Sequence, residues 1–385
     1  MKKNVRENTL KISTLDIILM CLTIYELVYF PHTIYIFIKY AILLYLFIKK
    51  ISNFKHNKQI CCAILLYGGI IFFSTIINQN SVNRYVSSFM YGFHIFIIFL
   101  TIYVFLKKRT FNELITIMYR FFATYIVVTD ILMIFISYDF SGSGTMYFVG
   151  NKFTVTFLHL LFLVLYHLKT KLYNNDFKHR SITLLIWMLS LIITFRVTCT
   201  TGVLMVIFYG FGVLLPNKIK QIMSNNWIVV GSILFINFLI FGSYNLLSNQ
   251  FVSGFISGVL GKSSTWLGRL RIYSVIFELI SNKLWLGYGF YSNIVQEMVG
   301  FGNAQNGVLK ILIDSGIIGL ISYLYLLFLY TKTNKDNCLF IWPLTSFVYC
   351  SILASIPEIS LTIIELFMVL TLIYCYKKLE VVKTN

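Results

Sequence analysis

Two arginines, Arg196 and Arg269, are the side chains of this sequence best suited to hold a phosphate-bearing ligand. A guanidinium is planar, keeps its charge at ordinary pH and can donate two parallel hydrogen bonds to phosphate oxygens. Arg196 also stands near the hydroxyl groups of Thr198, Thr200 and Thr201. The pair predicts a clamp for one diphosphate that uses no metal ion. The alternatives are that Arg196 anchors a helix end at a lipid surface and that Arg269 contacts lipid headgroups.

Glu297, Gln305 and Asn306 are the candidate catalytic residues. A carboxylate can accept a proton, whereas neutral amides can orient a hydroxyl or a diphosphate oxygen but take up no proton at ordinary pH. Glu297 is the carboxylate that shares a chain segment with Gln305. A reaction with a good leaving group can also proceed on positioning and charge stabilisation alone. Whether this chain uses a general base therefore stays open.

The composition predicts a chain whose main solvent is lipid. Hydrophobic residues make up 58% of the sequence, charged residues 12%, and the mean hydropathy is +0.79. These values argue against a soluble domain. The seven cysteines show no metal-ligand or redox spacing and are interpreted as small buried hydrophobes, so we expect no metal site and no cofactor. The net charge of +18 is explained by membrane topology, and nucleic acid is excluded as a partner.

Lysine and arginine positions predict that topology. Apolar segments of spanning length alternate with polar stretches, and every second polar stretch is basic, as the positive-inside rule describes. Of the 32 Lys and Arg residues, 22 fall on the side predicted to be cytoplasmic. Those residues lie at the two termini and in the stretches 49–58, 107–113, 169–180, 216–226 and 331–337. The chain is predicted to be one integral membrane domain, 1–385, with both termini cytoplasmic.

The elements that must position the candidate residues are twelve predicted transmembrane helices and one long external loop. The spans are expected at 14–31, 32–48, 59–77, 85–106, 114–136, 153–168, 181–195, 199–215, 227–244, 305–330, 338–356 and 359–376. The loop covers 245–304 and is too long to serve as a simple connection. Within it, Ser263 can cap an amphipathic helix whose apolar residues recur at helical spacing up to Ile280. The fold class is thus predicted to be an all-α polytopic membrane protein.

Ionisable residues at membrane depth are a further group of functional suspects. For most of them we expect interhelical hydrogen bonds or ion pairs. The group consists of Glu26, Lys39, His94, Arg120, Asp130, His159, Lys310 and Glu365.

An ordered set of residues resembles the large external loop of the O-antigen polymerase and O-antigen ligase superfamily. The resemblance covers about residues 263–325 and reads, in order, Gly268-Arg269, Tyr273, Gly287-Tyr288-Gly289-Phe290, Asn306, Gly316 and Gly319. Ligases of that superfamily, and many polymerases, carry His before the Asn, where this chain has Gln305. The departure disfavours the ligase alternative.

The resemblance implies a multi-span glycosyltransferase of the cytoplasmic (inner) membrane. It would extend an O-antigen or capsule polysaccharide by moving a growing glycan from undecaprenyl diphosphate to a lipid-linked repeat unit. Arg196 and Arg269 would bind the diphosphate, Gln305 and Asn306 would orient the reacting groups, and Gly287, Gly289, Gly316 and Gly319 would permit close backbone approach. The implied partners are undecaprenyl-diphosphate-linked oligosaccharides, membrane lipid and a chain-length regulator. A polysaccharide ligase and a lipid-linked oligosaccharide flippase or transporter remain alternatives, although the unmatched halves and single dominant loop are atypical of transporters.

Overall fold

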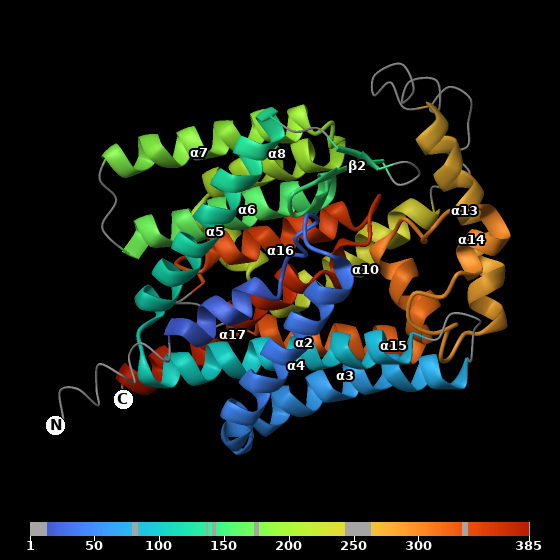
Figure 1. Ribbon diagram of the computed structural model, residues 1–385, viewed down its shortest axis with the longest axis horizontal. Helices are drawn as coiled ribbons and strands as arrows, with labels where there is room; N and C mark the ends of the chain where they lie inside the picture. Colours follow the sequence, from blue (N-terminus) through green and yellow to red (C-terminus); the bar gives the residue numbers. More distant parts are fainter. Residues whose placement is uncertain are drawn as a thin grey trace.

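The computed structural model shows a bundle of α-helices (Figure 1). It describes residues 14–78, 84–135, 138–140, 144–172, 177–242, 263–332 and 338–384. The first half of the bundle contains a helix at 14–22, α2 (His32–Lys50), the 3-10 helix η1 (Ile51–Asn57), α3 (Lys58–Ile77), α4 (Tyr85–Lys108), α5 (Phe111–Phe135), α6 (Lys152–Leu172) and α7 (Phe177–Arg196). The second half contains α8 (Thr200–Leu214), α9 (Asn217–Met223), α10 (Asn226–Gly242), α13 (Ser263–Asn282), α14 (Ile294–Val299), α15 (Gly307–Thr331), α16 (Trp342–Ala354), the 3-10 helix η2 (Ser360–Thr362) and α17 (Ile364–Thr384).

Several of these helices suit a membrane. Within the described residues, α3, α4, α5, α6 and α15 are long and apolar enough to cross one, and α9 with α10 adds a sixth candidate that is bent by 75°. The structure is therefore mainly helical and has the apolar helices of a membrane protein, whereas the count of twelve spans stays a prediction. Most predicted spans coincide with a helix to within a few residues, as α4 does with the segment 85–106.

The first predicted span differs most from the structure. Only residues 14–22 of the segment 14–31 are helical. The helix tightens and stops because the amides of Thr23 and Ile24 donate to carbonyls three residues earlier, and the Thr23 hydroxyl also donates to the Met20 carbonyl at 2.6 Å. Pro31 then precedes the first turn of α2, where a backbone N–H has no partner inside the helix, so the N–H that proline lacks is not missed.

A small antiparallel sheet between α5 and α6 was not predicted from the sequence. It consists of β1 (Tyr138–Phe140), β2 (Gly144–Tyr147) and β3 (Gly150–Asn151), in the order β1-β2-β3. Asp139 pairs with Thr145 and Tyr147 pairs with Gly150. Gly150, the first residue of β3 directly after the turn at 148–149, has a φ of +121°, which favours glycine.

The two ends of the bundle differ. Figure 1 shows the end of α6, the start of α7 and the end of α17 at one end, and α13 and α14 at the opposite end, with the sheet also displaced toward that side. The first of these ends carries described residues of the basic stretches, among them Lys108 in the last turn of α4 and Lys171 in the last turn of α6, and we call it the basic end. The other end carries most of the candidate residues, and we call it the loop end.

The helices α13 and α14 pack on the loop end through an apolar core of their own. Ile272, Ile276 and Leu279 of α13 are buried together with Val295 of α14 and Ile313 of α15. The predicted amphipathic helix from Ser263 is thus confirmed as α13, and its buried stripe faces α14 and α15. This packing sets the position of the segment between α13 and α15.

Candidate functional site

The site begins with a break in α15. Gly316 has φ 64° and ψ −165° inside this helix, so the regular backbone hydrogen bonds are interrupted there. On the near side of the break, the carbonyls of Ile313 and Asp314 accept hydrogen bonds from the amides of Tyr288 (2.6 Å) and Gly289 (3.2 Å). The backbone of the segment after α13 thereby replaces missing helical partners.

The far side of the break is paired in the same way. The amide of Ile317 donates to the Leu284 carbonyl at 2.8 Å, and the amide of Ile318 donates to the Trp285 carbonyl at 3.3 Å. Segment 284–289 therefore inserts into α15 and satisfies groups on both sides of the interruption. We call residues 284–291 the inserted segment.

α3 holds the inserted segment from a third direction. The Ser74 hydroxyl lies within hydrogen-bonding distance of the Asp314 carbonyl, at 2.8 Å, and of the Leu286 carbonyl. The Asn78 side-chain amide donates to the Gly287 carbonyl at 2.9 Å, and the Phe290 amide donates to the Thr75 hydroxyl at 3.0 Å. Side chains of α3 thus fix the inserted segment against α15.

Three of the four predicted glycines lie where two stretches of the backbone meet. Gly287, Gly289 and Gly316 all have positive φ. A Cβ on Gly287 would lie 2.4 Å from the Ile313 carbonyl oxygen, and one on Gly316 would lie 2.2 Å from the Trp285 carbonyl oxygen. A Cβ on Gly319 would lie 1.8 Å from the Ser315 hydroxyl oxygen. The close approach at Gly287 and Gly316 is between two backbones of the same chain.

Replacing Gly316 with alanine is expected to destabilise the protein strongly. The methyl group would collide with the Trp285 carbonyl, and the residue would also hold a backbone conformation that costs a non-glycine residue about 1–3 kcal/mol. We expect the thermal unfolding midpoint of the purified protein to fall by several degrees. Gly231→Ala in α10 is the matched control because a Cβ there meets nothing within 4 Å. Equal midpoints for the two variants would contradict the inserted geometry.

A cluster of charged and aromatic side chains lies beside the inserted segment. Lys310 and Asp314, one turn apart in α15, form a buried ion pair in which the ammonium is 2.6 Å from both carboxylate oxygens. The Lys310 ammonium also lies 4.1 Å from the ring centre of Tyr291. The guanidinium of Arg84, just before α4, lies 5.5 Å from the same ring. We call these four residues the Arg84 cluster.

The Arg84 cluster contains two cations, Lys310 and Arg84, and one carboxylate, Asp314. Asp314 neutralises Lys310 directly, and Arg84 acts on Asp314 only at longer range. Among the described residues, Arg84 has no acidic partner within salt-bridge distance. The Arg84 side chain is half-buried, and Tyr291 beside it is 42% exposed. A guanidinium beside an accessible ring can receive a phosphate or a sugar face. Sequence reasoning did not select Arg84 or Tyr291, although Arg84 is one of the few basic residues on the predicted external side.

Asn306 has a structural task in this arrangement. Its side-chain oxygen accepts from the amides of Val308 (2.9 Å) and Leu309 (3.0 Å), so it caps the start of α15. Its side-chain nitrogen donates to the Asn237 side-chain oxygen of α10 at 2.9 Å. The residue is fully buried. Asn306 therefore positions α15, and its polar atoms already have protein partners.

Gln305 and Glu297 are more accessible. Gln305 is half-buried and has a φ of 46°, which is uncommon for a residue with a side chain. Its backbone amide donates to the Asn303 side-chain oxygen at 2.8 Å. Glu297 lies in the first turn of α14 and is exposed. Both side chains belong to the same connection between α13 and α15 as the inserted segment.

The two predicted diphosphate ligands are described to different degrees. Arg196 ends α7 and is exposed, and Thr198 two residues later has a φ of 52°. Arg269 lies in α13, but its side chain falls outside the described residues, as does the first part of the predicted loop, 245–262. α7 packs against α6 and α8, and its far end points toward the loop end (Figure 1). The predicted clamp between the two arginines stays a prediction.

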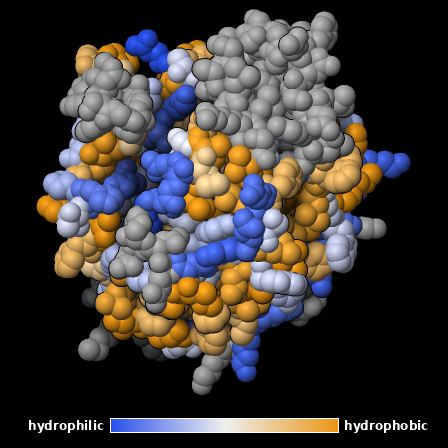
Figure 2. Space-filling view, turned by 90° about the vertical axis from the view of Figure 1, so that its right-hand side faces the viewer, coloured by the Kyte–Doolittle hydropathy of each residue, from blue (hydrophilic) through white to orange (hydrophobic). Residues whose placement is uncertain are grey.

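The surface of the loop end is mixed in polarity. Figure 2 looks onto this end and shows hydrophilic residues gathered across its middle, bordered by hydrophobic ones. Such a surface offers polar contacts within an apolar rim, which suits a ligand that has both a polar part and a lipid part.

Two predictions about ionisable residues at membrane depth are confirmed. His159 of α6 hydrogen-bonds Asp130 of α5, with 3.1 Å between Nε2 and Oδ1. His94 of α4 lies 2.9 Å from the Thr23 hydroxyl, through its Nε2. Both histidines are buried and tie neighbouring segments together. A structural role accounts for each of them.

The described part of the chain contains no group of three or more His, Cys, Asp or Glu side chains that could hold a metal ion.

A scan against protein-family models and a search of curated proteins both found no match for this chain.

Proposed function

We propose that this protein is a polysaccharide repeat-unit polymerase, a membrane glycosyltransferase. In the reaction, a hydroxyl oxygen of the acceptor repeat unit bonds to the anomeric carbon of the donor glycan. The bond from that carbon to the diphosphate oxygen breaks, undecaprenyl diphosphate leaves, and the hydroxyl proton passes to a base or to the departing diphosphate. The product is a glycan longer by one repeat unit on a lipid carrier.

The inserted segment is the observation that carries this proposal. It is held by both sides of the α15 break and by α3, so residues attached to it are fixed before a ligand arrives. Fixed cations stabilise charge that develops on a leaving diphosphate without any reorganisation. Arg84 beside Tyr291 supplies such a cation, and Lys283, exposed directly before the inserted segment, supplies a second.

Backbone strain supports the same location. Within the described residues, Thr198, Tyr291 and Gln305 are the non-glycine residues with positive φ. Gln305 is itself a candidate catalytic residue, Thr198 lies two residues after Arg196, and Tyr291 belongs to the Arg84 cluster. Strained backbone persists where the surrounding structure enforces it, and it is often found at functional sites. The coincidence favours these three positions as parts of one functional end.

The roles of the residues follow from their chemistry. Arg269 and Arg196 bind the donor diphosphate, and Arg84, just before α4, adds a further cation. The Gln305 amide orients a reacting hydroxyl or diphosphate oxygen, and Asn306 positions it by holding the start of α15. Glu297 is exposed and free to serve as the base.

The proposal includes a location and partners. The twelve predicted spans lie in the cytoplasmic membrane, both termini and the basic end face the cytoplasm, and the loop end faces outward. The basic stretches support that orientation because lysine and arginine are retained on the cytoplasmic side. The partners are undecaprenyl-diphosphate-linked repeat units, surrounding lipid and a regulator of chain length.

A deletion strain tests the activity because each alternative stops the pathway at a different product. Loss of a polymerase leaves export and final transfer intact, so single repeat units still reach the acceptor and replace the ladder of long chains. We expect that one-repeat product on gel analysis of surface glycan, restored to a ladder by the wild-type chain. Long polymer stranded on the lipid carrier would instead identify a ligase. Complete absence of surface glycan, with repeat units accumulating inside, would identify a flippase.

A further inference from the structure

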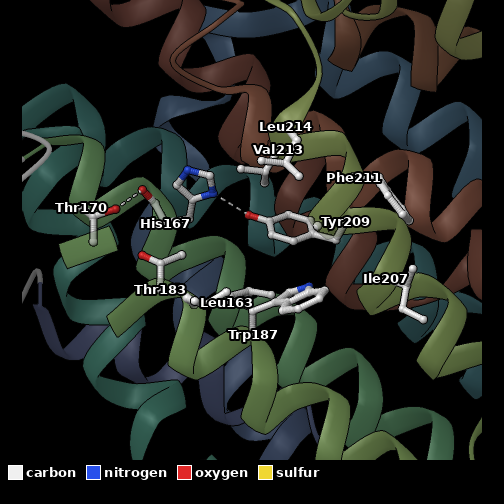
Figure 3. Close-up of a pocket in the computed structure, with 12 residues that line it drawn as sticks. Leu163, His167, Thr170, Thr183, Trp187, Ile207, Tyr209, Phe211, Val213 and Leu214 are labelled. Atoms are coloured by element: carbon white, nitrogen blue, oxygen red, sulfur yellow. Dashed lines mark hydrogen bonds between the residues drawn. The ribbon is translucent and has the colours of Figure 1, made fainter. Parts of the chain in front are cut away.

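A cavity of about 480 Å³ lies between α6, α7 and α8 (Figure 3). Its lining includes Leu163 and His167 of α6, Thr183 and Trp187 of α7, and Tyr209 and Leu214 of α8. This volume falls within the range of pockets that hold small organic ligands. None of the residues assigned to glycosyl transfer above lines it.

The cavity lies toward the basic end of the bundle. His167 is near the end of α6, Thr183 is near the start of α7, and Leu214 ends α8. Its rim faces outward, because Leu184, Phe211 and Leu214 are 59%, 65% and 79% exposed. α7 and α8 coincide with the predicted spans 181–195 and 199–215, and exposed apolar side chains on such a span would be covered by lipid. The cavity is therefore reached from the side of the bundle, through the hydrocarbon layer.

Polar groups inside the cavity already have protein partners. His167 Nδ1 lies 3.0 Å from the Tyr209 hydroxyl, as Figure 3 shows. The Trp187 indole donates to the Val206 carbonyl at 2.8 Å, and the Thr170 hydroxyl donates to the His167 carbonyl at 2.8 Å. A sugar would find few groups to bind here. A hydrocarbon chain matches the lining better, because leucine, valine and aromatic surfaces lose nothing by burying it.

Two lysines stand at the basic end of this cavity. The Lys220 ammonium of α9 donates to the carbonyl of Val213, a lining residue, at 2.7 Å. The Lys171 ammonium at the end of α6 donates to the Leu339 carbonyl at 3.0 Å. Both are close enough to His167 to act on it electrostatically. An ammonium has three donors, so each lysine is held in place and keeps donors for an anion.

We propose that this cavity binds an anionic phospholipid of the surrounding membrane, with one acyl chain between α6, α7 and α8 and the phosphate on Lys171 and Lys220. The apolar lining and lateral opening select a lipid tail, and the paired cations select a negative headgroup. Basic pockets between transmembrane helices bind anionic lipids by this combination. The site is independent of the proposed glycosyl transfer, and its test needs no enzyme activity.

The test uses purified full-length protein in detergent with phosphatidylglycerol that carries a photoactivatable group on one acyl chain. We expect crosslinks on peptides of α6, α7 and α8 around Leu163 and Ile207. Unlabelled phosphatidylglycerol should compete, whereas unlabelled phosphatidylcholine should compete far less. This comparison uses the wild-type chain and so does not depend on any variant folding. Equal competition by the two lipids would overturn the headgroup assignment.

Variants locate the site within the bundle. Ile207→Trp places a larger side chain in the lining and should remove the crosslinks, whereas Ile192→Trp on the exposed face of α7 should not. Lys171→Gln and Lys220→Gln should each lower the apparent affinity for phosphatidylglycerol about fivefold, and the exposed Lys218→Gln should leave it unchanged. Crosslinks that persist unchanged in Ile207→Trp, in protein that elutes as one species, would show ordinary surrounding lipid and overturn the proposal.

Discussion

Arg269→Ala is expected to stop chain extension in a reaction with purified protein and a lipid-linked repeat unit. Loss of a fixed donor to a developing oxyanion costs about 10²–10³ in rate. Arg271→Ala is the matched control, because two positions along α13 correspond to roughly 200° around the helix axis, so the two arginines cannot face one ligand. Arg269→Lys should recover only part of the rate, because a point charge lacks the two-pronged fork.

The readout must separate catalysis from misfolding and misinsertion. A cysteine at Gln296, exposed in α14, should react with an impermeant maleimide in intact cells in both the wild type and Arg269→Ala. A cysteine at Lys218, exposed in α9, should not react. The native Cys62 is exposed and is replaced by serine in this background. The clamp is refuted if Arg269→Ala extends chains at the wild-type rate, and the topology is refuted if position 218 is labelled and 296 is not.

The helices could be predicted from sequence because their ends are marked by charge and their interiors by hydropathy. α4 begins after a polar stretch and ends at Lys108, within two residues of the predicted boundary. α13 was found from the helical spacing of its apolar residues. The sheet between α5 and α6 was missed because its three strands are only two to four residues long. A pattern so short has too little periodicity to stand out from a loop.

The inserted segment shows where local patterns stop being informative. Gly287 and Gly316 signal backbone freedom, but nothing in either stretch says that the two meet. Their pairing crosses from the segment after α13 to the middle of α15, and α3 contributes Ser74 and Asn78 from more than two hundred residues away. Such contacts are decided by the whole bundle. The Arg84 cluster was missed for the same reason, because its members come from separate parts of the chain.

The sequence contains a local signal for the capping role of Asn306. Asparagine directly before an apolar helical run is a preferred N-cap residue. The family resemblance drew attention to a role at the substrate, whereas the structure engages its oxygen and nitrogen in capping α15 and in a contact with α10. Gln305, one residue earlier, keeps a more accessible side chain and a strained backbone. Of the two adjacent amides, Gln305 is the better placed to meet a ligand.

Asp314→Asn is expected to lower stability by about 3 kcal/mol, because it leaves the buried Lys310 ammonium without its counter-charge. Replacing both partners should cost much less, since a neutral pair of similar size carries no charge to compensate. The double variant Lys310→Met/Asp314→Asn is therefore predicted to unfold at a higher temperature than Asp314→Asn alone. Thermal unfolding of purified protein at one fixed scan rate measures the difference.

The same double variant decides whether the ion pair serves only the fold. In the proposed site, Lys310 supports Tyr291 through the ring contact at 4.1 Å, and Asp314 lies within electrostatic reach of Arg84. If the pair sets the position of this ring and this guanidinium, the double variant should regain stability and still extend chains slowly. A double variant no more stable than Asp314→Asn would mean that the two charges are not coupled. Recovery of both stability and the wild-type rate would restrict the pair to a structural role and leave Arg84 as the member of the cluster that meets the substrate.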